Sequence, residues 1–132
     1  MTERVDAKFL ANRFGPASKR GNLYKASHAQ RGPMDLVYHG ERIEDYPTQD
    51  GEVAYGKMNH EDEADFDDII ALCRAVDGTD YADEEELAQA LESLLNVDDF
   101  LRYLAVTVIV DDWDSYPNTG NNYYLFNNLK SG

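Results

Sequence analysis

Carboxylate and amide side chains gather in one short stretch near the end of the chain, directly after a long apolar segment. Mg²⁺ prefers oxygen ligands of these types, and a rigid cluster of them could hold a metal ion together with a phosphate group. The alternative interpretation is a turn in which Asp and Asn side chains bond to their own backbone. The residues concerned are Asp111, Asp112, Asp114, Asn118, Asn121 and Asn122.

The segments on either side of this polar loop must position it. The apolar spacing before the loop predicts a helix over 98–111, with Asp98 as its N-cap. The later part of that segment, VTVIV, is β-branched and is also compatible with a buried strand, but the helical spacing before it favours the helix. The residues YYLF after Asn122 predict a short strand. The side chains expected to face inward are Phe100, Leu101, Leu104, Ala105 and Val108, with Trp113 packed at the base of the loop.

The remainder of the chain completes an α+β fold that is mainly helical in its second half. Apolar side chains at helical spacing and local capping residues support three further helices. Asp6 lies near the start of the first, which Gly15-Pro16 would end, and Asp83 with Glu86 has the spacing of a capping box. The expected helices span 5–14, 65–77 and 84–95, and the expected strands are LYKA (23–26) and DLVY (35–38).

Length, composition and charge fit one domain of 132 residues, with 42% apolar residues and a net charge of −14. This charge argues against general affinity for nucleic acid or anionic membranes, because phosphate groups favour Lys and Arg. No run approaches the roughly 20 apolar residues of a membrane-spanning helix. Residues 1–31 nevertheless carry a charge of +5, against −19 for the rest. A nucleotide held between a basic edge and an acidic body would suit this distribution, although ordinary solvated faces explain it equally well.

Other classes of site have little support in the sequence. The single Cys73 excludes a disulfide within the chain and a cysteine-based zinc site, and its helical apolar neighbours predict a buried thiol. The histidines share no metal-ligand spacing, and no serine-hydrolase, zinc-protease or phosphate-cradling glycine motif is present. A calcium loop starting at Asp112 would have Tyr116 and Pro117 where a ligand and a glycine are needed.

Five segments, taken together, resemble the CotH family, the spore coat protein H-like kinases. They follow one another in the same order as in that family, from about Arg4 to Gly132, and WD…NNYYLF is the most specific part. The segments are VDAKFLANRFG, GNLYKA, DLVYHG followed by a tyrosine, FLRYLAV and DDWDSYPNTGNNYYLF.

The resemblance implies a fold related to protein kinases and transfer of the γ-phosphate of ATP to Ser or Thr of coat or secreted proteins, with ATP and Mg²⁺ as cofactors. In kinases a helix delivers a catalytic Asp, and an Asn before the next strand holds Mg²⁺. By this resemblance Asp114 is the candidate catalytic residue and Asn122 the preferred Mg²⁺ ligand, with Asn121 in reserve. Asp112 would assist through a hydrogen bond or cap the preceding helix.

Lys25 is the candidate for contacting the nucleotide phosphates, because a lysine on a strand in the basic half could reach a phosphate as a point charge. A solvated strand lysine is equally consistent with its position. No acid follows Asp114 in the sequence, whereas the family supplies a second metal-binding Asp from a later motif.

We therefore expect residues 1–132 to form a single incomplete domain, lacking strands before the first helix and the Asp motif after the last strand. Whether such a chain is an active enzyme stays open at this point. The alternative is a non-catalytic spore-coat or surface interaction protein that keeps a kinase-like shape. The family suggests the spore coat, the cell surface or secretion as the location, with protein substrates or coat proteins as partners.

Overall fold

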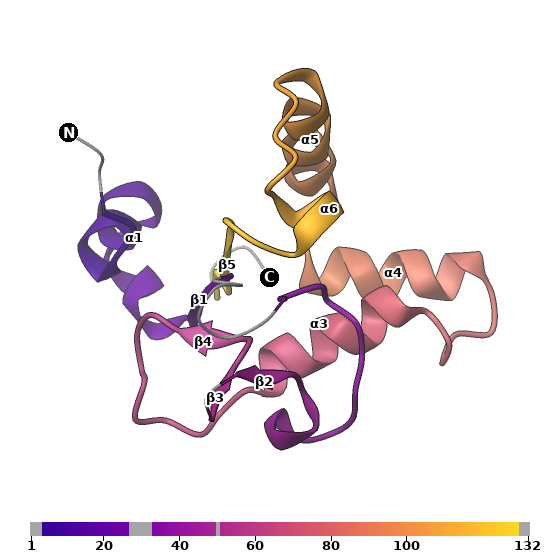
Figure 1. The fold of residues 1–132 in the computed structure, drawn as a ribbon, viewed down its shortest axis with the longest axis horizontal. Coiled ribbons are helices and arrows are strands. Elements are labelled where there is room, and N and C mark those ends of the chain that lie inside the picture. The colour runs from indigo at the N-terminus through magenta and orange to yellow at the C-terminus, as the bar shows by residue number, and fades with distance from the viewer. Residues whose placement is uncertain (1–3, 27–32, 50, 130–132) are drawn as a thin grey trace.

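The computed structural model describes residues 4–26, 33–49 and 51–129 (Figure 1). Helices surround a three-stranded antiparallel sheet with the strand order β4-β1-β5, which confirms the predicted α+β class. In chain order the elements are α1 (Ala7–Phe14), η1 (Pro16–Arg20), β1 (Leu23–Lys25), η2 (Ile43–Asp45), β2 (Thr48–Gln49), β3 (Glu52–Val53), β4 (Gly56–Lys57), α3 (Asp67–Asp77), α4 (Glu84–Leu94), α5 (Val97–Ile109), α6 (Tyr116–Thr119) and β5 (Tyr124–Phe126).

Local capping groups explain where the helices begin. The Asp6 carboxylate accepts hydrogen bonds from two backbone N–H groups of the first turn of α1, and Asp83 does the same for α4. These side chains satisfy N–H groups that have no partner within the helix. Helix α5 begins one residue earlier than predicted, because the side chain of Asn96, not that of Asp98, accepts from the Asp99 N–H.

The strand register places two sets of side chains on opposite faces of the sheet. Tyr24 lies beside Lys57 on β4 and beside Leu125 on β5, whereas Lys25 lies beside Tyr124. Neighbouring residues of one strand point to opposite faces. The Tyr24 hydroxyl donates a 2.6 Å hydrogen bond to Asp68 of α3, so α3 covers the face that carries Tyr24.

The expected strand LYKA is confirmed as β1, but DLVY is not a strand. Leu36 has a φ of 61°, in the left-handed region, which an extended strand cannot accommodate. Its backbone N–H donates to the hydroxyl of Tyr55 at 2.9 Å, and so a side chain replaces the strand partner. The prediction failed because Tyr55 is distant in the sequence.

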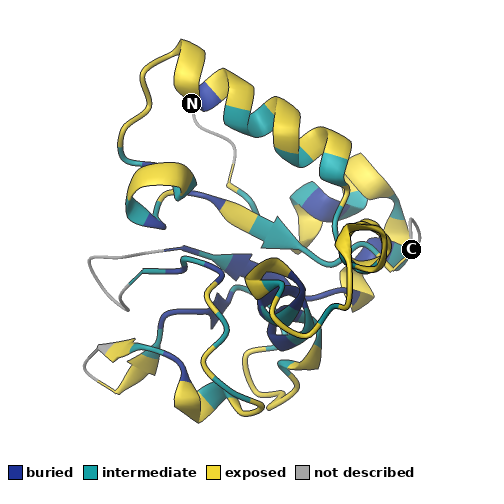
Figure 2. Ribbon diagram, turned by 90° about the vertical axis from the view of Figure 1, so that its right-hand side faces the viewer, coloured by how far each residue is buried: buried dark blue, intermediate teal, exposed yellow. Residues whose placement is uncertain are grey.

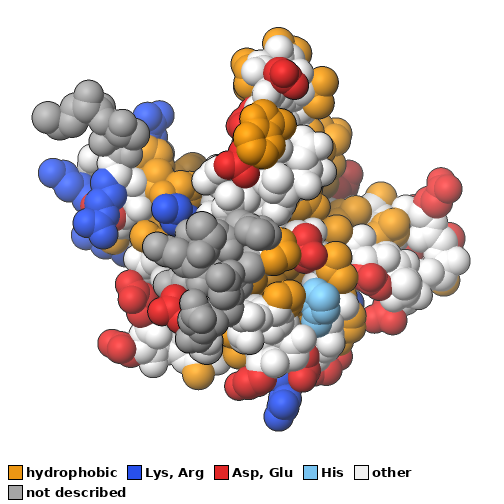
Figure 3. All heavy atoms as spheres, viewed as in Figure 1, with side chains coloured by type: hydrophobic (Ala, Val, Ile, Leu, Met, Phe, Trp, Pro, Cys, Tyr) orange, Lys and Arg blue, Asp and Glu red, His pale blue; other side chains and the backbone are white. Residues whose placement is uncertain are grey.

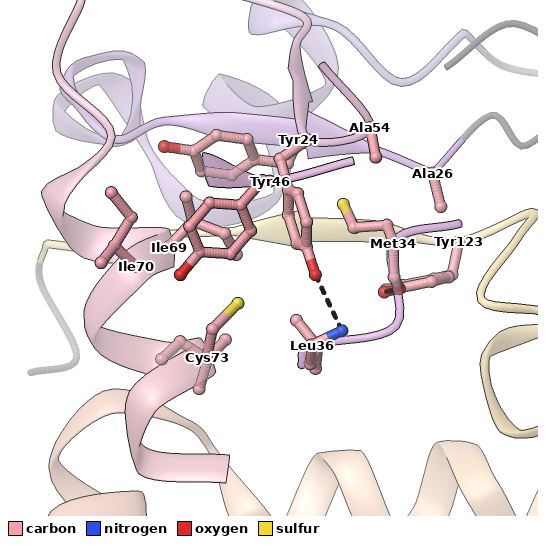
Figure 4. Packing of buried hydrophobic residues seen from close by; sticks show 12 residues of the cluster. Tyr24, Ala26, Met34, Leu36, Tyr46, Ala54, Ile69, Ile70, Cys73 and Tyr123 are labelled. Carbon is pink, nitrogen blue, oxygen red and sulfur yellow. Dashed lines mark hydrogen bonds between the residues drawn. The ribbon is translucent and has the colours of Figure 1, made fainter. Parts of the chain in front are cut away.

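The hydrophobic core lies between the sheet, helix α3 and the segment around Leu36 (Figures 2 and 4). Cys73 is fully buried within it, as predicted, and burial raises the pKa of its thiol to about 12. The buried cluster comprises Tyr24, Ala26, Met34, Leu36, Tyr46, Ala54, Tyr55, Ile69, Ile70, Leu72, Cys73 and Tyr123.

Helix α5 departs most from expectation. It projects away from the sheet (Figure 1), and Thr107 is its one buried residue. Leu101 is 56% exposed and Val108 77% exposed, and Ala105 is exposed as well, so the predicted inward face is wrong for these side chains. Trp113 is 70% exposed and does not pack under the loop. Periodicity predicts an apolar stripe, but it does not say which surface covers it. No helix in the described ranges is long and apolar enough to span a membrane.

Candidate functional site

The polar loop between α5 and β5 is built from consecutive tight turns. After α5 the chain reverses at Asp111, which has a φ of 55°, and the Asp112 N–H donates to the Thr107 carbonyl at 2.9 Å. Ser115 is buried, and its hydroxyl donates to the Asp112 carbonyl at 2.7 Å. The single-turn helix α6 follows. Asp112 thus caps the end of α5, one of the two roles expected for it, and does so through its backbone N–H.

The Asp114 carboxylate is the centre of this loop. Asn122 donates through Nδ2 to Oδ2 at 2.6 Å. The other oxygen, Oδ1, accepts from Thr119 Oγ1 at 3.2 Å and from Asn121 Nδ2 at 3.3 Å. The loop therefore brings together the three residues assigned from the sequence to catalysis and metal binding, and it adds Thr119, which the sequence analysis did not single out. The chemical roles of these residues stay predictions.

The side chain of Asn122 is held in one orientation by two bonds to the same residue. Its Nδ2 donates to the Asp114 carboxylate and also to the Asp114 backbone carbonyl at 3.0 Å. The backbone φ of Asn122 is 54°, a left-handed conformation that Asn tolerates better than most residues. Because the amide nitrogen faces Asp114, the amide oxygen Oδ1 is the atom left to ligate a cation.

The segment around Met34 holds the loop through hydrogen bonds. The Met34 N–H donates to the Gly120 carbonyl at 2.9 Å, and the Tyr123 hydroxyl donates to the Met34 carbonyl. A Cβ at Gly120 would lie 3.3 Å from the backbone of Met34 and of Asp35, so this close approach favours glycine. Burial raises the pKa of the Tyr123 phenol, which keeps it a neutral donor.

A row of aromatic rings joins α5 to this support. The rings of Phe100 and Tyr116 meet edge-on with centroids 5.4 Å apart, and those of Tyr116 and Tyr123 do so at 5.3 Å. Rings in this arrangement attract one another beyond the area they bury. The aromatic rings therefore pack the start of α5 against the polar loop, although most of α5 is exposed.

Lys25 lies on the strand next to the site but is not part of the Asp114 cluster. It is in register with Tyr124 of β5, two residues after Asn122, and its Nζ lies 5.8 Å from the centre of the Tyr124 ring. Within the described residues no hydrogen bond or ion pair joins Lys25 to Asp114 or Asn122. Its position is compatible with the proposed phosphate contact without testing it.

Two charged residues that the sequence analysis did not single out lie between the sheet and α3 or beside them, on the face that carries Tyr24. Lys57 is only 6% exposed; its Nζ donates to the Glu63 carbonyl at 3.2 Å and lies 4.7 Å from the centre of the Phe66 ring. The Asp68 carboxylate accepts from Tyr24, from Asn22 at 3.1 Å and from Asn127 at 2.9 Å. No local signal separated these two from their charged neighbours.

A cavity of about 1070 Å³ lies beside β5. Asn122 and Tyr124 line it on the strand side, and residues 92–100 of the α4–α5 junction line it on the other side. Thr119 lines a second hollow of about 370 Å³ together with Asp35. Figure 3 shows Lys and Arg side chains gathered over α1 and η1, with acidic side chains distributed over the other elements. The basic residues that gather near the start of the sequence therefore also lie together on the surface of the fold.

The donor set fits Mg²⁺ in part. Asp114 and Asn122 provide a carboxylate and an amide oxygen, and the described residues contain no group of three or more His, Cys, Asp or Glu side chains placed to hold a metal. Mg²⁺ characteristically takes one or two protein oxygens and completes its octahedron with phosphate oxygens and water. The site therefore suits an ion that arrives with a nucleotide better than an ion held by protein alone.

These features define an α+β domain in which a hydrogen-bonded Asp–Asn loop precedes an edge strand. The family model described as "CotH kinase protein" matches residues 1–132, so the chain belongs to the CotH family. Over 112 residues the chain is 27% identical to Invasin CotH3 of Rhizopus delemar, a match that covers 85% of this chain and 17% of that protein. The chain thus spans less than a fifth of that relative's length. No solved structure matches the chain significantly.

Proposed function

We propose that this chain forms part of an atypical protein kinase that transfers the γ-phosphate of ATP to Ser or Thr of coat or secreted proteins. The observation that carries the proposal is the pair of hydrogen bonds that Asn122 Nδ2 donates to the backbone carbonyl and to the carboxylate of Asp114. Phosphoryl transfer depends on holding an orienting carboxylate and a metal-binding amide in fixed relation. Membership of a family described as CotH kinase protein supports the same activity.

In this mechanism each residue of the loop has a separate task. Asp114 accepts a hydrogen bond from the acceptor hydroxyl and orients it for attack on the γ-phosphate. Asn122 would hold Mg²⁺ through Oδ1, with Asn121 as the second candidate, and the ion would neutralise charge on the phosphates. Because Asn122 also bonds to Asp114, the metal ligand and the orienting carboxylate cannot move independently.

Lys25 would contact the nucleotide phosphates from the neighbouring strand. Its cross-strand position beside Tyr124 places it on the face of the sheet that α3 does not cover. Lys57 is the less suitable lysine for this task, because its ammonium group is buried between the sheet and residues 63–66 and is already engaged there.

The test is phosphate transfer from labelled ATP, with Mg²⁺, to the chain itself and to a serine-rich acceptor protein. Asp114→Asn keeps the shape of the side chain but removes its charge, and we expect at least about a 100-fold loss of transfer, the usual range for an acid–base group. Asp111→Asn is the matched control, since Asp111 is exposed and Asn also tolerates its left-handed backbone. Equal labelling by both variants would remove Asp114 from the mechanism.

A second candidate function is a non-catalytic surface interaction protein. The exposed apolar side chains of α5, among them Val106 and Ile109, favour it because large apolar patches commonly mark contact surfaces. The name of the Rhizopus relative, an invasin, points in the same direction. If Asp114→Asn abolishes transfer, the catalytic role stands; if the unaltered chain neither transfers phosphate nor gains thermal stability from ATP and Mg²⁺, the interaction role is the better one.

A further inference from the structure

We propose that Thr119 is a positioning residue that fixes the carboxylate of Asp114 so that its Oδ2 atom, and not Oδ1, meets the acceptor hydroxyl. This inference rests on the proposed kinase function. It concerns which oxygen of Asp114 acts and which side chain decides that choice.

The hydrogen bonds around Asp114 are unequally distributed over its two oxygens. Oδ1 accepts from Thr119 Oγ1 and from Asn121 Nδ2, whereas Asn122 is the one donor to Oδ2 among the residues that the structure describes. A carboxylate has about four lone-pair positions, two on each oxygen. When Thr119 and Asn121 both donate to it, Oδ1 is saturated, whereas Oδ2 keeps one position, which is the position a hydroxyl donor can use.

Packing holds the backbone next to Thr119 in place. Thr119 is the last residue of α6, and the following Gly120 is held against Met34 by a backbone bond and by close packing. Its hydroxyl sits on a short β-branched side chain with few rotamers. Asn121 has a longer side chain, and its hydrogen bond to Oδ1 is slightly longer, at 3.3 Å against 3.2 Å for Thr119.

The Thr119 hydroxyl has a choice of two acceptors. Oγ1 lies 3.2 Å from Asp114 Oδ1 and 3.1 Å from the Ser115 carbonyl, and a hydroxyl has a single proton to donate. If the hydroxyl donated only to the Ser115 carbonyl, Thr119 would not orient Asp114. Thr119 is a positioning residue only if its proton goes to Asp114, and removal of the hydroxyl tests this.

The experiment compares Thr119→Val, which removes the hydroxyl with little change of shape, with Thr119→Ser, which keeps it. The first readout is the χ2 angle of Asp114, which sets where the two carboxylate oxygens point, measured in crystal structures of the wild type and both variants. We expect the carboxylate of Asp114 to be rotated or disordered in Thr119→Val, while Thr119→Ser keeps the wild-type χ2 angle. The second readout is phosphate transfer, for which Thr119→Val should lower kcat roughly five- to tenfold, the worth of one hydrogen bond, and leave the KM for the acceptor protein unchanged.

A wild-type χ2 angle of Asp114 in Thr119→Val, or failure of Thr119→Ser to restore both readouts, would overturn the proposal. An unchanged kcat in Thr119→Val would do so as well. If the unaltered chain transfers no phosphate, the kinase function falls, yet the χ2 angles still decide whether Thr119 orients Asp114. The two failures are therefore distinguishable.

Discussion

At the scale of single residues, the site depends on side chains that do two things at once. Asn122 keeps a left-handed backbone and also bonds to Asp114. Asn meets both demands because it tolerates that conformation and carries an amide. A substitution can separate these two roles, since glycine satisfies the first demand and no aliphatic residue satisfies the second.

We expect Asn122→Gly and Asn122→Ala to be equally inactive but unequally stable. Both lose the amide, so phosphate transfer should fall at least about tenfold in each. Alanine adds a Cβ that the positive φ disfavours, which should make Asn122→Ala less stable than Asn122→Gly by about 1 kcal/mol. Urea denaturation measures the difference. Retained transfer in Asn122→Gly would show that the amide is not needed, and equal stabilities would contradict the backbone argument.

At the scale of elements, the segment Met34–Leu36 supports the loop, and Tyr55 holds that segment in place. The Tyr55 hydroxyl accepts the buried Leu36 N–H at 2.9 Å and donates to Asp35 at 3.3 Å. Figure 4 shows the bond to Leu36 within the core. Tyr46 packs edge-on against Tyr55 with centroids 5.3 Å apart. Its buried hydroxyl lies near the Cys73 thiol but makes no hydrogen bond of normal geometry with any described residue.

Tyr55 and Tyr46 offer a matched test of how the segment Met34–Leu36 is held. Tyr55→Phe should lower the free energy of unfolding by about 1–3 kcal/mol, because the Leu36 N–H loses its partner inside the core. Tyr46→Phe removes a hydroxyl that has no hydrogen-bond partner among the described residues, so it should leave the free energy of unfolding unchanged or raise it slightly. Chemical denaturation of the two variants decides the matter. Similar losses in both would mean that the hydroxyl of Tyr55 is not what holds the segment.

The elements also show what the sequence could and could not predict. Helices α1, α3, α4 and α5 were predicted to within a few residues because apolar spacing and Asp caps are local signals, as at Asp6 and Asp83. The cap of α5 is Asn96 and not the predicted Asp98, and the single-turn helix α6 was not predicted. The strand at 35–38 was wrong because the Leu36 conformation depends on Tyr55, a distant residue. The Asp114–Asn122 pair was anticipated through the CotH resemblance. Thr119 was not, since its contact with Asp114 exists only once α6 folds.

At the scale of the whole molecule, burial is concentrated on one side. The core joins the sheet to α3, while α5 projects from it with large apolar side chains in solvent (Figures 1 and 2). Hydrophobic stabilisation is roughly proportional to the area removed from water. Equal substitutions on α3 and α5 should therefore have very different effects on stability.

Ile69 and Ile109 allow this comparison, because the side chain is the same and only its exposure differs. Ile69 on α3 is 3% exposed, whereas Ile109 on α5 is 81% exposed. Ile69→Ala should cost about 2–5 kcal/mol of unfolding free energy, the usual range for emptying a core position. Ile109→Ala should stay within about 0.5 kcal/mol of wild type. Urea denaturation at two protein concentrations measures both. A loss at Ile109 that matches the loss at Ile69 and grows with protein concentration would show that association covers the α5 face, and a concentration-independent loss would place that face in the core.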